Sequence, residues 1–566
     1  MKTLSLLFLA LIASANIAMA QVKHKLVTNY WDFGKTKVMS RGFYYVDKFS
    51  GETTLEHGKW NYWNRNGKLT ERRFYEKGEL HGEVSLFYTN GNKKEEGFFE
   101  MGEQDGTYKA WHENGKLKTE GQYEFGEPTG VWTSYYENGS LHSQEKIEDG
   151  ITYMQNFWIY DKTQTLKNGN GEMVLFYKSN GNVNELYTYK DGLKDGPFTE
   201  YSVYGAKLVE GAYSKNQKSG EWTFKYYDGK LDTKMTYKSG MLNGPYVKYY
   251  DNETVNIEGN YVDGEKDGHW IWYTNIGTKD MEGDFLDGLQ DGKWEYWYPG
   301  ENPKKKYEGH YKLGKRNGEW EFWYPEGQKW KKGSYLDDQL EGLWKTWWEN
   351  GNLLSEGSYL DGKEHGNWKQ YFEEGVIKND GNFKMGLLDG AWTSYYKKKN
   401  VHLEGYYQDN MKVGIWKRYS KKRILIEEGE YKIVTIEKSM KYGPFKKHKV
   451  LESARDGHWI WYSEKDGGKT HEGNYSKGKE QGTWTYYYPG GTKPMQELSY
   501  KDGRLNGTTI KYSWRPHKVT SKISYKNGVK DGKMIVYDKR GRVAIEKIFK
   551  EGIEVRADGN PVRFSP

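Results

Sequence analysis

The sequence contains no cysteine in its 566 residues. This absence excludes disulfide bonds, thiolate metal sites, a cysteine nucleophile and the acylated cysteine that anchors bacterial lipoproteins. Aliphatic residues are scarce as well: hydrophobic residues make up 35% of the chain, and 24 Trp, 50 Tyr and 20 Phe supply nearly half of them. A large aliphatic core is therefore not expected, and the stability of the fold must come from the packing of aromatic side chains.

Long hydrophobic runs are absent beyond the first twenty residues. Residues 1–20, MKTLSLLFLALIASANIAMA, combine an early lysine, an apolar run and a small-residue end before Gln21, which is typical of a cleaved secretory signal. No other stretch approaches the roughly 18 apolar residues that a membrane helix needs. We therefore expect an exported protein, periplasmic, at the cell surface or secreted, with no transmembrane segment after signal cleavage.

Neither sign of charge is in large excess. Lys and Arg number 86 against 79 Asp and Glu, and the formal charge of +7 is spread along the chain. This balance does not favour nucleic-acid binding, and export argues against it too. The 69 glycines and 29% charged residues resemble a disordered chain, but 17% aromatic residues predict a folded one.

A glycine that precedes an aromatic segment recurs along the chain, at a spacing of 24 residues in most copies and 25 near the C-terminal end. The unit is, loosely, D-G-x-W-x-x-Y-Y-x-N-G-x-x-x-x-E-G-x-Y-x-x-G, and no helix fits within it. We count the repeat glycine as position one of each copy. The nineteen repeat glycines are Gly58, Gly82, Gly106, Gly130, Gly171, Gly196, Gly220, Gly244, Gly268, Gly292, Gly318, Gly342, Gly366, Gly390, Gly414, Gly457, Gly482, Gly507 and Gly532.

Each copy is predicted to be a β-hairpin. An Asn-Gly pair such as Asn350-Gly351 tolerates positive φ at both residues, as a two-residue hairpin turn requires. Pairing outward from this turn puts Trp344 opposite Gly357, so that the ring can lie across a residue without a side chain. Alternation along a strand places position three on the same face as positions five and seven, and position six on the other.

A single hairpin is marginally stable in water, so each copy must pair with its neighbours. The sequence therefore predicts an all-β fold, an elongated single-layer twisted antiparallel sheet of about 19–21 tandem hairpin repeats of 24–25 residues. Large flat side chains would remove apolar area from water in such a sheet. The expected segments are a signal peptide (1–20), an N-terminal cap (21–57), repeats (58–150), a degenerate repeat (151–170), repeats (171–429), a basic interruption (430–456), repeats (457–552) and a C-terminal tail (553–566).

Three stretches of the repeat resemble a known family. EGSYLDGKEHGNW (356–368), EGNYVDGEKDGHW (258–270) and EGDFLDGLQDGKW (282–294) follow the glycine, aromatic, glycine, glycine, tryptophan spacing of the MORN repeat in its bacterial variant form. The resemblance covers roughly residues 40–552. It implies a non-catalytic scaffold that associates with proteins or lipids. Some bacterial members are labelled antitoxin components, a role that fits badly with a signal peptide.

The tryptophans divide into two predicted classes. Those at position three are expected to hold the sheet together: Trp60, Trp132, Trp222, Trp270, Trp294, Trp320, Trp344, Trp368, Trp392, Trp416, Trp459 and Trp484. Those at position six face the other way and are candidate binding residues: Trp63, Trp111, Trp297, Trp323 and Trp347. Exposed rows of such rings could stack sugars, whereas the simpler interpretation is packing within the sheet.

The basic interruption at 430–456 supports two interpretations. It could be a docking loop for an acidic partner, or a degenerate copy with an extended, solvated hairpin. Lysine-rich turns elsewhere, such as 302–309 and 395–402, make an acidic lipid or polysaccharide a further candidate partner. The lysines of the candidate docking loop are Lys438, Lys441, Lys446, Lys447 and Lys449.

We find no catalytic or metal-binding pattern in the sequence. His57, His81 and His365 occupy a turn position where other copies have Asp, and Ser476 with Lys479 forms an S-x-x-K that lies in a repeat turn. We therefore expect no enzyme activity, no cofactor and no metal. The predicted function is an exported scaffold that associates with a protein partner or an envelope component through its aromatic face. The alternative is a carbohydrate or envelope-polymer binder that uses the position-six rings.

Overall fold

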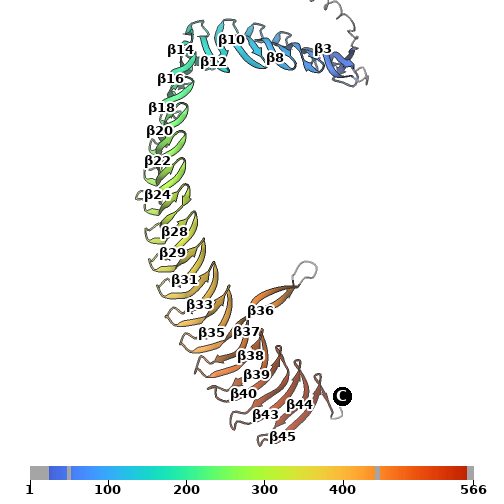
Figure 1. The fold of residues 1–566 in the computed structure, drawn as a ribbon, viewed down its shortest axis with the longest axis vertical. Coiled ribbons are helices and arrows are strands. Elements are labelled where there is room, and N and C mark those ends of the chain that lie inside the picture. Colours follow the sequence, from blue (N-terminus) through green and yellow to red (C-terminus); the bar gives the residue numbers. More distant parts are fainter. Residues whose placement is uncertain (1–23, 47–52, 440–446, 557–566) are drawn as a thin grey trace, which may run out of the picture. The chain divides into compact units, whose positions relative to one another are not determined.

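The computed structural model describes residues 24–46, 53–439 and 447–556. These residues form strands and turns without a helix, and the 46 strands belong to one long open antiparallel sheet, which confirms the predicted fold class (Figure 1). The described residues accordingly include no helix long and apolar enough to cross a membrane. The expected signal peptide lies outside the described residues. By its contacts the chain divides into two units, up to Lys266 and from Asp267.

The first unit contains the strands β1 to β21, which succeed one another as hairpins (Figure 1). Their bounds are β1 (His24–Tyr30), β2 (Val38–Val46), β3 (Thr53–Trp63), β4 (Leu69–Glu76), β5 (Glu79–Leu80), β6 (Gly82–Phe87), β7 (Lys93–Glu100), β8 (Glu103–Trp111), β9 (Leu117–Glu124), β10 (Glu127–Tyr135), β11 (Leu141–Glu148), β12 (Ile151–Trp158), β13 (Gln164–Lys167), β14 (Asn170–Phe176), β15 (Val183–Lys190), β16 (Leu193–Tyr201), β17 (Lys207–Ser214), β18 (Gln217–Lys225), β19 (Leu231–Lys238), β20 (Met241–Tyr249) and β21 (Val255–Val262).

The second unit contains the remaining strands, of which β22 begins at the unit boundary. Their bounds are β22 (Glu265–Tyr273), β23 (Lys279–Leu286), β24 (Leu289–Trp297), β25 (Lys305–Lys312), β26 (Lys315–Arg316), β27 (Gly318–Trp323), β28 (Lys329–Leu336), β29 (Gln339–Trp347), β30 (Leu353–Leu360), β31 (Lys363–Tyr371), β32 (Ile377–Lys384), β33 (Leu387–Tyr395), β34 (Val401–Gln408), β35 (Met411–Tyr419), β36 (Leu425–Ser439), β37 (Lys447–Tyr462), β38 (Lys469–Ser476), β39 (Lys479–Tyr487), β40 (Pro494–Lys501), β41 (Arg504–Leu505), β42 (Gly507–Tyr512), β43 (Val519–Lys526), β44 (Val529–Tyr537), β45 (Val543–Lys550) and β46 (Ile553–Val555).

The Asn-Gly turn differs from its prediction. Trp348 N–H donates to the carbonyl of Asn352 (2.8 Å) and Gly351 N–H donates to the carbonyl of Trp348 (2.9 Å). Only Gly351 of this turn has a positive φ, at 85°. The loop is therefore a three-residue type I turn closed by a glycine bulge rather than a two-residue turn. The Asn350 side chain accepts the N–H of Asn352 (2.9 Å), which accounts for asparagine at this position.

The two-residue turn occurs at the opposite end of the strands, where Asp-Gly joins one hairpin to the next. Asp361 and Gly362 have φ of 49° and 74° and connect β30 to β31, with Leu360 paired to Lys363. Two positive φ values are those of a type I′ turn, whose twist matches that of the flanking strands. The two turn types therefore alternate along the sheet.

Eleven of the twelve position-three tryptophans are shown to cover a glycine of the preceding strand. Trp344 pairs in register with Gly357, as predicted, but its ring lies over Gly333, where an added Cβ would be 2.1 Å from the indole. The indole N–H donates to the carbonyl of Ser334 (3.0 Å). We call this arrangement the Gly–Trp pair. Its other members are Gly42–Trp60, Gly121–Trp132, Gly211–Trp222, Gly283–Trp294, Gly309–Trp320, Gly357–Trp368, Gly381–Trp392, Gly405–Trp416, Gly429–Trp459 and Gly473–Trp484.

The core of the sheet is a row of aromatic rings on the tryptophan face. Trp344 meets Tyr335 edge to face at 5.1 Å between ring centroids, and Trp320 stacks on Phe322 at 5.9 Å. Such contacts add to the stability that area burial provides. Trp132, Trp368 and Trp392 are half-buried. The other predicted position-three tryptophans are buried: Trp60, Trp222, Trp270, Trp294, Trp320, Trp344, Trp416, Trp459 and Trp484.

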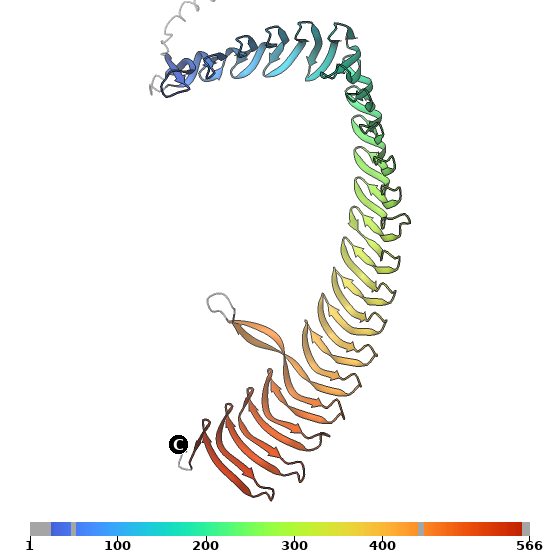
Figure 2. The same ribbon diagram turned by 180° about the vertical axis from the view of Figure 1, so that it is seen from behind.

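The sequence interruptions and the ends also belong to the sheet. The lead-in contributes β1, which pairs with β2, and the tail contributes β46, which pairs with β45. The interruption at 151–170 forms β12 and β13, and its Met154, Phe157 and Leu166 pack with Tyr189 in a small buried cluster. The interruption at 430–456 lengthens β36 and β37 into a hairpin that runs out past its neighbours (Figures 1 and 2).

Candidate functional site: the charged face and the β36–β37 hairpin

The position-six tryptophans lie on the face of the sheet opposite the Gly–Trp pairs, which we call the charged face. Trp63 and Trp111 belong to the first unit. Trp297, Trp323 and Trp347 lie on three successive hairpins of the second. All five are half-buried, so none is a fully open ring.

Lysine ammonium groups lie over several of these rings. Lys305 Nζ is 5.9 Å from the ring centroid of Trp323, and Lys279 Nζ is 5.7 Å from that of Trp297. In the first unit, Lys93 Nζ lies 5.5 Å from the ring centroid of Trp111. A cation within about 6 Å of the ring face is attracted to it. These indoles therefore form part of a surface that carries charge.

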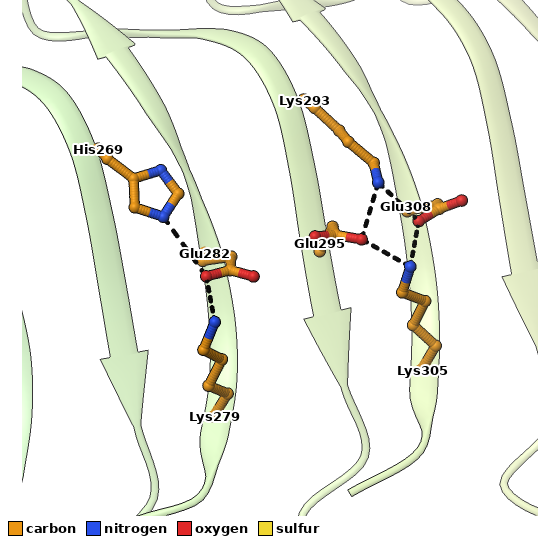
Figure 3. Close-up of polar contacts among 7 residues, drawn as sticks. All are labelled: His269, Lys279, Glu282, Lys293, Glu295, Lys305 and Glu308. Atoms are coloured by element: carbon orange, nitrogen blue, oxygen red, sulfur yellow. Dashed lines mark hydrogen bonds and ion pairs between the residues drawn. The ribbon is translucent and has the colours of Figure 1, made fainter.

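The same lysines take part in ion pairs, and one pair of Lys305 crosses from strand to strand. Lys305 Nζ lies 2.6 Å from Glu295 on β24 and also contacts Glu308 on its own strand, β25. Lys293 Nζ closes the group at 2.9 Å from Glu295 and 3.2 Å from Glu308 (Figure 3). The four charges alternate in sign. The network therefore ties two adjacent strands together on the charged face.

The pKa of Glu295 is lowered within this network. Burial alone would raise its pKa, but the hydrogen bonds from Lys305 and Lys293 outweigh burial and lower the pKa to about 2. Hydrogen bonds to the ionised form are the usual cause of such a shift. Glu295 is therefore ionised at any pH above the acid range.

The preceding hairpin repeats the pattern with a histidine. His269 Nδ1 lies 2.8 Å from Asp284. Its Nε2 lies 3.4 Å from Glu282 (Figure 3). Lys279 Nζ is 2.6 Å from the same Glu282 carboxylate. The equivalent His458 contacts Glu472 at 3.1 Å farther along this unit. The charged face is therefore a recurring arrangement of acidic and basic groups.

A glutamate precedes the glycine in eight of the eleven Gly–Trp pairs, where it is the centre of this pattern, and sequence reasoning missed its role. In copies with tyrosine at position six, the phenol donates to it: Tyr371 to Glu356 and Tyr419 to Glu404, both at 2.8 Å. The signal was present in the recurring E-G dipeptide. It could have been recognised from the pairing of residues next to position six with residues next to this glutamate on the preceding strand, such as Gln370 with Ser355.

The structure describes three of the five lysines of the predicted docking loop. Lys441 and Lys446 lie outside the described residues. Lys438 and Lys447 lie in β36 and β37, where their backbones pair with His448 and Ser439. Lys449 is exposed and pairs across the hairpin with Glu437. The extended-hairpin interpretation of this interruption is therefore confirmed, while its docking role stays a prediction.

The base of the hairpin is held by an arginine–glutamate–arginine group. Arg455 Nη2 lies 2.6 Å from one carboxylate oxygen of Glu427, and Arg418 Nη2 lies 2.6 Å from the other. The Arg455 guanidinium also lies over Trp459 at 4.4 Å from its ring centroid. Charge-assisted contacts of this kind fix orientation. The hairpin therefore projects from a fixed base.

Seven segments of the chain match the family model of the MORN repeat variant. They are residues 80–101, 104–124, 128–149, 218–239, 316–337, 340–361 and 364–385. The resemblance seen in the sequence is confirmed for these seven repeats. No curated protein matches the chain.

The chain also matches several solved structures. The crystal structure of TcdB2-TccC3-Cdc42 is 10% identical, with 95% of this chain and 32% of that chain covered and a TM-score of 0.12. The Photorhabdus luminescens Tc holotoxin pore with the TccC3-D651A mutation is 11% identical, with 92% and 28% covered and a TM-score of 0.12. Alternansucrase in complex with isomaltononaose is 12% identical, with 49% and 20% covered and a TM-score of 0.14. The chain spans about a third of the first structure, and scores this low define no shared fold.

Proposed function

We propose that the chain is an exported, non-catalytic repeat scaffold that binds a protein partner, with the β36–β37 hairpin as its main contact. The observation that carries this proposal is the hairpin itself. It interrupts an otherwise regular series of repeats with two strands of 15 and 16 residues, where strands of the neighbouring repeats have eight or nine. Export rests on the N-terminal sequence pattern.

The free edges of the hairpin are suited to binding an extended segment. β35 pairs with β36 only as far as Tyr431, and β38 pairs with β37 only from Gly457. Between these points, the described parts of the two strands pair only with each other. Unpaired strand edges offer backbone donors and acceptors to a strand of a partner. Leu451, 60% exposed, adds an apolar contact.

The charge of the hairpin indicates the chemistry of the partner. Residues 432–454 contain six lysines and two glutamates. A surplus of positive charge speeds and orients the association with an acidic surface. On the charged face, lysines already lie over position-six rings, which disfavours the stacking of sugars on those rings. The proposed partner is therefore a protein with an acidic extended segment.

Affinity capture from native envelope material tests this proposal. In the variant, residues 433–453 are replaced by Asn-Gly, which joins the paired residues Lys432 and Ala454 through a two-residue turn and leaves the base of the hairpin intact. We expect partner capture by the full chain, weakened by added salt, and its loss in the variant. Circular dichroism of both proteins controls for folding. Equal capture by the two would show that the hairpin is dispensable.

A further inference from the structure

The first interruption breaks the series of Gly–Trp pairs. In a regular copy, glycine stands opposite its own tryptophan and is covered by the tryptophan of the next strand. In β11 this position is Glu145, which pairs with Trp132 on one side and with Met154 of β12 on the other. Both the glycine and the covering indole are therefore missing here, and Met154 belongs instead to the buried cluster with Phe157, Leu166 and Tyr189.

Two adjoining hollows occupy this part of the first unit, and both are lined by Thr119, Ser134 and His142. The one beside Glu145 has a volume of about 520 Å³, and the one beside β12 and β14 has a volume of about 990 Å³. These volumes are of the size of ligand pockets, about 300–1,000 Å³. We call the two hollows together the trough.

One end of the trough is polar. The Nε1–H of Trp132 is buried and has no partner among the described residues, whereas the same group of Trp294 donates to the carbonyl of Asp284 (3.0 Å). Ser134 Oγ lies 2.7 Å from Ser143 Oγ and 3.0 Å from His142 Nδ1. A buried donor without a partner destabilises the fold. An oxygen of a ligand would satisfy it.

The other end is aromatic and open. Tyr160 is 61% exposed and Phe176 is 42% exposed, and both line the larger hollow. Tyr136 supports this end, because it packs on Tyr160 at 5.2 Å and on His142 at 4.5 Å between ring centroids. Its hydroxyl donates to the carbonyl of Trp158 (2.8 Å). Tyr160 is thus held in place by its contact with Tyr136.

The charges around the trough balance. Lys118 and Lys178 line it together with Glu137 and Glu145. Burial lowers the pKa of His142, which keeps its imidazole neutral at neutral pH. Burial also raises the pKa of the Glu145 carboxyl, while hydrogen bonding with Ser143 opposes the rise. A ligand that complements this surface is polar and carries no net charge.

We propose that the trough is a binding site for a neutral oligosaccharide, with sugar rings against Tyr160 and Phe176 and hydroxyl groups bonded to Trp132, Ser134, Ser143 and Glu145. A pyranose ring offers both an apolar C–H face for aromatic rings and hydroxyl groups that donate and accept, which matches the two ends. The site goes beyond the proposed scaffold function, because it lies in the first unit and takes a different class of ligand.

Calorimetric titration of the full chain tests this site. The probes are neutral hexasaccharides of β-1,4-linked glucose, α-1,4-linked glucose and β-1,4-linked N-acetylglucosamine, each at about 1 mM. We expect one of them to bind, and the double variant Tyr160→Ala/Phe176→Ala to lose about tenfold or more in affinity. Tyr204→Ala is the matched control, because Tyr204 is 91% exposed in the same unit and does not line the trough; its affinity should be unchanged.

A second variant changes a polar group that lines the trough. Glu145→Ala removes the carboxylate and should weaken saccharide binding while the circular dichroism spectrum is retained. Absence of binding to all three probes, or binding that survives Tyr160→Ala/Phe176→Ala, would overturn the proposal. The hairpin replacement separates this result from the scaffold function, because it should leave saccharide binding intact.

Discussion

At the scale of single residues, glycine has two distinct uses in this chain. In the turns it supplies positive φ, as Gly351 and Gly362 do. In the strands, Gly333 has no such φ, and its value lies in the missing Cβ, because the indole of Trp344 occupies that space. The two uses predict different responses to substitution.

Gly333→Ala should destabilise the second unit through steric overlap with Trp344. Overpacking of this kind costs about 1–3 kcal/mol or more. The measurement is the urea midpoint followed by circular dichroism. On a Trp344→Leu background, which removes the ring, the same glycine substitution should cost little, because only residues in contact couple. Equal costs on the two backgrounds would show that the ring is not the cause.

At the scale of strands and turns, much of the structure could be predicted from the period. The pairing of Trp344 with Gly357 followed from the position of the turn. The position of the turn did not indicate which glycine the ring covers, because Gly333 and Gly357 lie at similar distances along the chain from Trp344. The register shift between Lys332 and Ser334 decides this. The turn type was predicted wrongly, because Asn-Gly suits both a two-residue turn and a type I turn with a bulge.

The candidate sites were predicted less completely than the fold. The five position-six tryptophans were placed on the correct face, but the lysines over them and the shared glutamates depend on contacts between strands. The trough could have been suspected from Glu145, which stands where a regular copy has the glycine of its Gly–Trp pair. Of its open rings, Phe176 stands at position six of the copy that begins at Gly171, where only tryptophans were considered, and Tyr160 lies in the interruption and gave no signal.

The ion pairs between β24 and β25 predict a pH dependence of stability. Because the folded pKa of Glu295 is lowered to about 2, its contribution is complete above the ordinary glutamate range and is lost as pH falls from about 4.5 through 2. Glu295→Gln should cost about 1–3 kcal/mol at pH 6. The difference in thermal midpoint between the variant and the wild type should close by about pH 2.

The control for this prediction is Glu349→Gln, a substitution at an exposed turn residue of the same unit. Its thermal midpoint should match that of the wild type at pH 6 and at about pH 2, since surface charges of this kind contribute little to stability. A difference between Glu295→Gln and the wild type that stays constant from pH 6 to the acid range would contradict the assigned pKa.

At the scale of the whole molecule, stability is the sum of repeats and of the contacts between neighbours. Each indole completes the hairpin before its own, so a full period can be removed without loss of any type of contact. Removal of residues 342–365 joins Glu341 to Gly366 and places Trp368 where Trp344 stood relative to Gly333. The chain would then have one fewer repeat and an otherwise equivalent sheet.

We expect this deletion to retain the circular dichroism spectrum per residue and to leave the chain monodisperse. Deletion of half a period, residues 342–353, removes a single strand with its turn and breaks the antiparallel alternation that follows. That variant should aggregate or lose signal, as shown by size-exclusion chromatography and circular dichroism. If both deletions fold equally well, the period is not the unit of stability.

The backward placement of each indole has a consequence for how the chain is made. In a polypeptide that emerges N-terminus first, the indole of each new strand can cover the glycine of the finished hairpin as soon as that strand pairs. Only the glycine of the newest hairpin then remains uncovered, however many copies follow. A long, aromatic-rich chain can in this way fold step by step, with little apolar surface exposed to neighbouring molecules at any time.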